Sequence, residues 1–298
     1  MRLLVPYEHG RTAQRLPAWL RRPIAHAGEY RAVEGLLDEL HLATVCQEAK
    51  CPNRGECYAS GTATFLIAGD ACTRGCRFCA VETRVPAPLD ADEPARVAEA
   101  VARLGLRHAV VTMVTRDDLG DGASGHVAAT IAAIRRVGSG VAVEVLVSDF
   151  GGDEAAIDAV VDAAPDVFNH NLETVPRLYA EVRPGASYER SLGVLERVKE
   201  RVPEMPTKSG LMLGLGETHD EVVAVMRDLR AAGCDLLTLG QYLRPSARHL
   251  PVAEFVTPEA FAALAREGRR VGFAGVASAP FVRSSYHAAE LAAGGERA

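Results

Sequence analysis

The chain has 298 residues, of which 48% are hydrophobic and 24% are charged. These proportions are typical of a folded globular protein, and they exclude disordered chains, collagen-like chains and small disulfide scaffolds. The 33 basic and 39 acidic residues leave a formal net charge of −6, which argues against a general nucleic-acid-binding surface, and no apolar run is long enough to cross a bilayer.

The first part of the chain is expected to be irregular. Residues 1–10 lack the apolar core of a signal peptide, so we expect a cytoplasmic protein. Prolines at positions 6, 17, 23 and 52 interrupt any long helix, and only residues 30–42 have a helical pattern. We therefore predict an N-terminal extension over residues 1–61 that wraps the following domain.

From residue 62 to residue 268, short β-rich runs alternate with longer segments rich in Ala, Leu, Arg and Glu, a pattern typical of β-α units on a parallel sheet. The predicted strands span residues 62–68, 108–114, 141–147, 166–170, 209–214 and 236–240. The predicted helices span residues 92–104, 125–137, 153–163, 187–201, 217–232 and 258–267. Periodicity leaves open a partial barrel or an open doubly wound sheet, and in both folds the loops after the strands carry the active site.

Residues 269–298 are predicted to form a C-terminal extension. They contain another short apolar segment, followed by Arg283, Ser284, Ser285 and Tyr286 in a tail that returns to the core.

Six of the seven cysteines lie between residues 46 and 79. In a reducing compartment such crowding indicates metal or cluster ligation rather than disulfides. Cys234 stands alone in a strand-like stretch and is most simply a small buried residue.

One cysteine triad, Cys72, Cys76 and Cys79, directly follows the first predicted strand with the spacing C-x3-C-x2-C. Three thiolates on such a loop can hold a four-iron cluster and leave one iron without a protein ligand, where a chelating small molecule can bind. The alternative is a structural zinc site with a fourth ligand elsewhere, although zinc sites more often combine two C-x2-C pairs.

The other triad, Cys46, Cys51 and Cys57, has the spacing C-x4-C-x5-C and precedes the predicted barrel. On its own it indicates a structural zinc or cluster site. A four-iron cluster at this triad would need a fourth ligand, and Cys234, the one cysteine outside the two triads, is a candidate by composition.

The two triads and several other segments together resemble the lipoyl synthase family, within the radical S-adenosylmethionine (SAM) superfamily. The resemblance covers about residues 44 to 288, and the segments that carry it are 51–57 (CPNRGEC), 61–65 (GTATF), 72–79, 116–122, 168–173 (FNHNLE), 182–185 (VRPG), 206–218, 237–242 (LTLGQY) and 283–286 (RSSY).

The resemblance implies an α/β fold, a partial (β/α)6 TIM-type barrel with N-terminal and C-terminal extensions, and two [4Fe-4S] clusters. Cys72, Cys76 and Cys79 would hold the SAM-binding cluster. Cys46, Cys51 and Cys57 would hold an auxiliary cluster whose fourth ligand is a serine of the Arg-Ser-Ser motif. Alignment on that motif assigns the fourth ligand to Ser285, with Ser284 as the close alternative. Ser285 thus replaces Cys234 as the candidate for the fourth ligand.

The family reaction inserts two sulfur atoms at C6 and C8 of an octanoyl chain bound to a lysine of a carrier protein. Each hydrogen abstraction uses one SAM, and the auxiliary cluster supplies the sulfur and is consumed. The implied partners are octanoylated lipoyl-carrier domains (2-oxoacid dehydrogenase E2 subunits and the glycine cleavage H protein), a ferredoxin- or flavodoxin-type electron donor and an iron–sulfur cluster carrier. Neither nucleic acid nor membrane is expected as a partner.

Four residues are candidates for SAM binding. Asn171 and Glu173 follow the fourth strand and can bind ribose hydroxyls or the SAM ammonium, with turn formation as the alternative. Arg183 can pair with the SAM carboxylate or form a surface salt bridge. Glu217 ends a G-x-x-x-G-x-x-E pattern that lies against adenine in the superfamily, and its alternative is a helix start.

Other residues near the predicted site have plainer interpretations. Arg116, Asp117 and Asp118 form a charged cluster or a helix cap. Lys208 and Arg283 have no assigned role, and His170 is interpreted as a core histidine. Tyr7, Trp19 and Tyr30 are expected to be packing residues.

Two other functions are alternatives to the activity that the resemblance implies. The first is a sulfur-inserting enzyme of the biotin synthase type, and the second is a zinc-stapled binding protein without catalysis.

Overall fold

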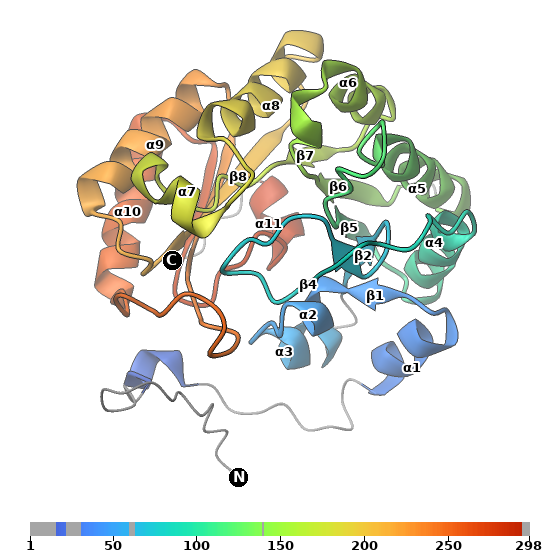
Figure 1. The fold of residues 1–298 in the computed structure, drawn as a ribbon, viewed down its shortest axis with the longest axis horizontal. Coiled ribbons are helices and arrows are strands. Elements are labelled where there is room, and N and C mark those ends of the chain that lie inside the picture. The colour runs from blue at the N-terminus through green and yellow to red at the C-terminus, as the bar shows by residue number, and fades with distance from the viewer. Residues whose placement is uncertain (1–15, 22–30, 60–62, 139, 294–298) are drawn as a thin grey trace.

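The computed structural model describes residues 16–21, 31–59, 63–138 and 140–293 (Figure 1). Tyr7 and Tyr30 lie outside the described residues. Trp19, in the short helix η1 (Ala18–Leu20), is 39% exposed, so it is not a core packing residue of the described chain.

The centre of the molecule is an eight-stranded sheet in the order β1-β2-β5-β6-β7-β8-β9-β10. Seven of these strands run parallel to their neighbours: β2 (Thr64–Ile67), β5 (His108–Met113), β6 (Ala142–Leu146), β7 (Val167–Asn169), β8 (Thr207–Leu213), β9 (Leu236–Gln241) and β10 (Gly275–Ser278). The eighth, β1 (Ala43–Thr44), pairs antiparallel with β2. Within the described residues the edge strands β1 and β10 do not pair with each other, so the curved sheet is an open, partial barrel.

Helices cover the outside of the sheet and bury its outward-facing side chains, as parallel sheets require (Figure 1). The long ones are α4 (Glu93–Arg103), α5 (Ser124–Val137), α6 (Glu154–Asp162), α8 (Tyr188–Arg201), α9 (His219–Ala231) and α10 (Pro258–Val271). Each of the six predicted strands and six predicted helices matches one of these elements within a few residues. The α/β partial-barrel fold is therefore confirmed.

Side-chain caps define where several helices begin. Thr218 and Glu221 form a reciprocal capping box at the start of α9, and Asp153 and Thr257 cap α6 and α10. These caps end the loops that follow β8, β6 and β9, so they help fix the loops at the carboxyl end of the barrel.

The N-terminal extension contributes α1 (Arg31–Glu39), β1, α2 (Val45–Glu48) and α3 (Arg54–Ala59). These elements lie beside β2 at one edge of the sheet, on the open side of the barrel (Figure 1). The triad Cys46, Cys51 and Cys57 is therefore carried to the gap between the two sheet edges.

The C-terminal segment adds structure at the other edge. Helix α10 continues to Val271, past the expected boundary after residue 268, and β10 is a seventh parallel strand where only a short apolar segment was expected. Helix α11 (Ala288–Ala292) follows the tail, and its Leu291 packs with Val167 and Leu236 at the starts of β7 and β9. It thereby covers the amino-terminal end of the barrel and leaves the carboxyl end for the site. None of the described helices is long and apolar enough to cross a membrane.

Candidate active site at the carboxyl end of the barrel

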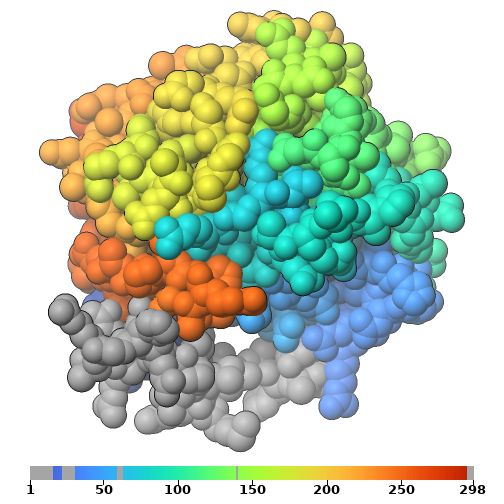
Figure 2. All heavy atoms as spheres, viewed as in Figure 1, coloured from blue at the N-terminus to red at the C-terminus, as the bar shows by residue number. Residues whose placement is uncertain are grey.

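The loop after β2 carries Cys72, Cys76 and Cys79 across the carboxyl end of the barrel. Its turn begins with two residues at positive φ, Ala68 (66°) and Gly69 (105°), and Cys72 ends the short strand β3 (Ala71–Cys72), which pairs with β4 (Glu82–Thr83). In Figure 2 this cyan segment runs between the yellow part of the surface and the orange loop that follows β9.

Backbone contacts hold this cysteine loop on both sides. The Arg77 amide donates to the Val182 carbonyl (2.9 Å), and the Arg77 carbonyl accepts from the Leu250 amide (3.0 Å). On the same side as Leu250, Nε2 of His249 lies 2.9 Å from the Cys79 carbonyl oxygen. The loop is therefore clamped between the segment after β7 and the segment after β9.

Arg74, between Cys72 and Cys76, anchors the loop to the barrel. Its Nε and Nη2 donate to the two carboxylate oxygens of Asp117 (2.8 and 2.7 Å), and Nη2 also lies 2.7 Å from Oδ1 of the buried Asp149. This ion pairing holds the pKa of Asp149 well below its usual range despite burial. Asp117 therefore binds the cysteine loop rather than capping a helix.

Cys76 and Cys79 of this loop lie within electrostatic reach of Glu173, and Arg183 acts on Cys76 as well. Burial raises the pKa of Cys79 to about 12, and it raises the pKa of Cys76 as well. The Arg183 guanidinium opposes the shift at Cys76, whereas Cys72 and Glu173 add to it. Three thiols on one loop fit a cluster with one open iron. Among the described residues, no three His, Cys, Asp or Glu side chains converge closely enough to hold a single metal ion.

Asn171 and Glu173 lie just beyond the end of β7, next to this cysteine loop. Nδ2 of Asn171 donates to Oε1 of Glu173 (3.0 Å), and the Glu173 backbone bridges to Leu211 of β8. Burial raises the pKa of Glu173, and Arg183 opposes that shift. The side chains face the site while the backbone, with Glu173 at a φ of 69°, makes the turn.

Arg183 is buried, with 9% of its surface exposed. Its Nη1 donates to the carbonyls of Asn171 (2.9 Å) and Leu172 (3.1 Å) and to the hydroxyl of Tyr179 (2.8 Å). Its Nε is buried without a hydrogen-bond partner among the described residues. The surface salt bridge considered from the sequence is therefore wrong, and the buried guanidinium has donor capacity to spare for an anion.

Glu217 supports the loop after β8. Its carboxylate oxygens accept from the backbone amides of Gly214 (2.5 Å) and Leu215 (2.9 Å). Burial raises its pKa, and these amides oppose the shift. Both oxygens are thus engaged with the loop backbone, which limits what Glu217 offers directly to a ligand.

The second triad is assembled by two short helices. Cys46 is buried on α2, Cys57 lies on α3, and Cys51 lies between them with its amide bonded to the Cys46 carbonyl (3.1 Å). Burial raises the pKa of Cys46 to about 11, and the neighbouring Cys51 adds to the shift. The structure therefore brings these three cysteines into one region on the open side of the barrel.

The C-terminal tail lies against this second triad segment. Nδ2 of Asn53 donates to the Phe281 carbonyl (2.7 Å), and the Tyr286 hydroxyl donates to Oε1 of Glu56 (2.6 Å). Ser285 lies between these two contacts and is half-buried, and its hydroxyl bonds to no described residue. Asn53 and Glu56 were not singled out from the sequence. Their signal is their position inside the segment from Cys51 to Cys57.

Ser284, unlike Ser285, has a hydrogen-bond partner among the described side chains. Its Oγ lies 2.7 Å from Nδ2 and 3.0 Å from Oδ1 of Asn171. The two serines that sequence reasoning left as alternatives are therefore in different surroundings.

Cys234 precedes β9 at the amino-terminal end of the sheet, away from the loops that carry the triads. It is fully buried, and burial raises its pKa to about 12. Its thiol is 3.4 Å from the Leu236 carbonyl oxygen. It is the small buried residue that its sequence context indicated.

Three further charged or polar side chains stabilise the barrel. Arg116 is buried and bonds to Asp118 and to the Ala68 carbonyl, which fixes the turn before the cysteine loop. Lys208 is buried in an ion pair with Glu144 (2.8 Å). His170 is a core residue, as expected: its Nδ1 donates to the Val147 carbonyl (2.8 Å), and its Nε2 has no partner among the described residues.

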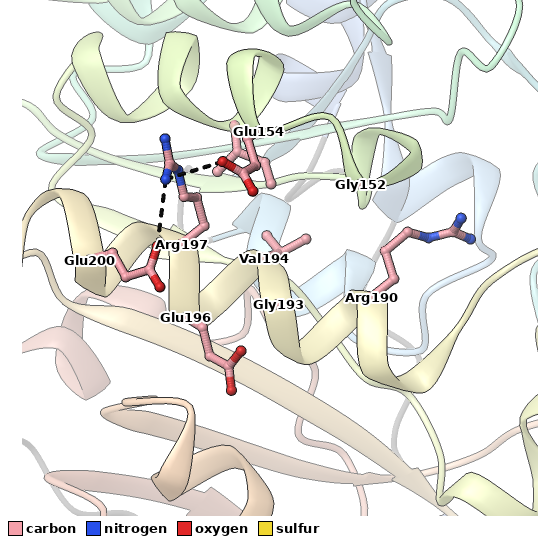
Figure 3. A pocket seen from close by; sticks show the side chains of 9 residues that line it. Gly152, Glu154, Arg190, Gly193, Val194, Glu196, Arg197 and Glu200 are labelled. Atoms are coloured by element: carbon pink, nitrogen blue, oxygen red, sulfur yellow. Dashed lines mark ion pairs between the residues drawn. The ribbon is translucent and has the colours of Figure 1, made fainter.

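A groove of about 260 Å³ lies elsewhere, on the outer surface between α6 and α8 (Figure 3). Among its charged side chains, Arg197 pairs with Glu154 (3.2 Å) and Glu200 (3.5 Å). This groove contains none of the cysteines and is not part of the candidate site.

Comparison with known proteins identifies the superfamily. The Radical SAM superfamily profile matches residues 66–229, the part of the barrel from β2 to α9. Two curated relatives are the lipoyl synthases of Syntrophotalea carbinolica, 57% identical over 91% of this chain and 88% of its own length, and of Trichlorobacter lovleyi, 58% identical over 94% and 99%.

Solved structures share the fold at low sequence identity. The [FeFe]-hydrogenase maturase HydG from Carboxydothermus hydrogenoformans aligns with a TM-score of 0.57 at 15% identity, covering 71% of this chain and 52% of its own. Methylornithine synthase aligns with a TM-score of 0.50 at 15% identity, covering 78% and 68%. These two similarities support the partial barrel.

Proposed function

The chain belongs to the lipoyl synthase family of the radical SAM superfamily, and from this membership we propose which residues carry each part of the reaction. Lipoyl synthase activity, a [4Fe-4S] cluster and SAM come with the family. The biotin-synthase-type and zinc-stapled alternatives are therefore wrong. The observation that carries the residue assignment is the C-terminal tail, which contacts both Asn171 at the SAM side and Asn53 at the N-terminal triad.

We propose that Cys72, Cys76 and Cys79 hold the cluster that binds SAM. Such a cluster supplies an electron that cleaves SAM to a 5′-deoxyadenosyl radical, which can take hydrogen from unactivated carbon. The chain's part is to hold three thiolates on one loop and leave one iron open. Arg74 maintains that loop through Asp117 and Asp149.

Four residues are proposed to position SAM beside this loop. Arg183 offers a buried guanidinium, whose Nε has no hydrogen-bond partner in the described part of the chain, to the SAM carboxylate. Asn171 and Glu173 offer an amide and a carboxylate to the ribose hydroxyls or the ammonium. Glu217 acts through the backbone it holds, by shaping the loop from Gly214 that lies against adenine.

The second [4Fe-4S] cluster is proposed to be held by Cys46, Cys51, Cys57 and Ser285. The contacts of Phe281 and Tyr286 with the triad segment support a ligand from the Arg-Ser-Ser segment, because they flank it on both sides. The engagement of Ser284 with Asn171 supports the same choice. Oxygen is a harder ligand than thiolate, so a serine-ligated iron suits a cluster that gives up its sulfur.

The proposed substrate is a protein-bound octanoyl-lysine that gains sulfur at C6 and C8. These carbons carry no acidic hydrogens, so general acid–base groups could not activate them. The proposed partners are octanoylated carrier domains of 2-oxoacid dehydrogenase E2 subunits and the glycine cleavage H protein, a ferredoxin- or flavodoxin-type reductant, and a cluster carrier. A reducing cytoplasm is the proposed location, since it keeps six ligand thiols available.

The test is anaerobic incubation of the reconstituted Ser285→Ala variant with SAM, reductant and an octanoyl-lysyl peptide. We expect 5′-deoxyadenosine to form while the peptide gains no sulfur, measured by mass. Cys76→Ala is the matched variant for the other cluster, and it should form no 5′-deoxyadenosine. Full lipoyl formation by Ser285→Ala would refute the ligand assignment.

A further inference from the structure

Ser284 links two distant parts of the chain. Its hydroxyl contacts both polar atoms of the Asn171 amide, at 2.7 and 3.0 Å, across 113 residues of sequence. These contacts orient the Asn171 amide and hold the tail near the end of β7. No cysteine takes part in it.

Two glycines make room for the tail against the sheet. A Cβ on Gly210 of β8 would lie 2.5 Å from Oγ1 of Thr238, 2.9 Å from Oδ1 of Asn171 and 3.1 Å from Oγ of Ser284. A Cβ on Gly240 of β9 would lie 2.1 Å from the Val282 carbonyl oxygen. The tail therefore occupies the volume that side chains at these two strand positions would fill.

The amide that Ser284 contacts is part of the proposed SAM site. Nδ2 of Asn171 also donates to Glu173, and the Asn171 carbonyl accepts from the buried Arg183. Arg283, next to Ser284, is close enough to lower the pKa of Glu173. Docking of the tail thus acts on the residues that would receive SAM.

We propose that Ser284 is a positioning residue that ties the Arg-Ser-Ser tail to Asn171, so that SAM affinity depends on the docked tail. Neighbouring serines then have separate roles, because Ser284 orients the SAM site while Ser285 is directed to the auxiliary cluster. The inference rests on the proposed function at one point, which is that Asn171 contacts SAM.

The test measures the SAM dissociation constant of reconstituted protein by anaerobic equilibrium dialysis. Loss of one hydrogen bond changes an equilibrium constant by about three- to tenfold, so Ser284→Ala should weaken SAM binding by that factor. Its iron and sulfide content should stay at about eight of each per chain, as two four-iron clusters require. Ser285→Ala is the matched control and should show the reverse, with SAM affinity retained and iron lost.

A double-mutant cycle separates positioning from general loosening of the fold. If Ser284 acts through Asn171, adding Ser284→Ala to Asn171→Ala should weaken SAM binding no further than Asn171→Ala alone. A loosened tail would instead multiply the two losses.

Three results would overturn the inference. They are unchanged SAM affinity in Ser284→Ala, multiplied losses in the double variant, and iron loss in Ser284→Ala with iron retained in Ser285→Ala. Failure of the Ser285 assignment alone is distinguishable, because it appears in the iron content of Ser285→Ala and leaves the Ser284 affinity result standing.

Discussion

Nη2 of Arg74 lies 2.7 Å from Oδ1 of Asp149, a carboxylate whose side chain has no exposed surface. The other oxygen of Asp149 accepts from Nε of Arg190 on α8 (2.8 Å). One buried carboxylate therefore joins the cysteine loop, the segment after β6 and the outer helix. The placement of Cys72 and Cys76 depends on this contact.

We expect Asp149→Ala to destabilise the protein strongly. The substitution breaks the ion pairs of Asp149 with both Arg74 and Arg190, and breaking a buried ion pair costs about 3–5 kcal/mol in the free energy of unfolding. Anaerobic urea unfolding measures it. Asp117→Ala is the control, because Asp117 bonds to the same arginine but its side chain is 42% exposed, and exposed pairs contribute about 1 kcal/mol or less. Equal losses in the two variants would contradict this account.

Gly240→Ala should displace the tail, because the new Cβ would collide with the Val282 carbonyl. We expect this variant to lose iron from the auxiliary cluster and to insert no sulfur. Gly193→Ala, in α8 with no atom within 4 Å of its Cβ position, is the control, and it should be neutral or gain about 0.4–1 kcal/mol in stability. Iron assays and unfolding curves on both variants check the prediction. Full iron content in Gly240→Ala would show that cluster binding does not depend on close packing of the tail against Gly240.

Glu217→Ala should weaken SAM binding by loosening the loop after β8. The substitution leaves the Gly214 and Leu215 amides without their acceptor; a fully buried unsatisfied group costs about 1–3 kcal/mol in stability, and these part-buried amides should cost less. Glu217→Gln keeps one acceptor oxygen, so its loss of SAM affinity and of stability should be smaller. Parallel dialysis and unfolding experiments compare the two. A loss of SAM affinity with unchanged stability in both variants would instead indicate direct contact of Glu217 with SAM.

The lowered pKa of His170 predicts that the stability of the protein depends on pH. Burial, reinforced by Arg183, lowers its pKa to about 4, whereas the unfolded chain titrates near 6.5. Between these values the unfolded state binds a proton that the folded state excludes. The contribution of neutral His170 to the free energy of unfolding is therefore fully present above pH 6.5 and is lost as the pH falls. The contribution lost between pH 7.5 and 5.5 is about 1 kcal/mol. Unfolding of His170→Asn at the two pH values should show a smaller loss, and an identical slope would contradict the assignment.

Much of the fold could be predicted from local patterns. Runs such as His108–Met113 have the composition and length of buried strands, and Thr218 with Glu221 forms a capping box that depends only on nearby residues. β10 could not be assigned with the same ease, because three of its four residues are small (Gly275, Ala277 and Ser278) and its pairing with β9 is a contact distant in sequence.

The family could also be predicted from the sequence alone, because the spacing of the cysteines is a local property that the residues themselves display, while their roles as cluster ligands stay a prediction. The roles proposed for Ser284, Ser285 and Arg183 needed the tertiary structure. Two adjacent serines have the same chemistry, and only the approach of Asn171, 113 residues away, distinguishes them. Likewise, an arginine has the same charge in any sequence, and whether it lies at the surface or buried beside Cys76 is decided by how β7, α7 (Tyr179–Val182) and the cysteine loop pack together.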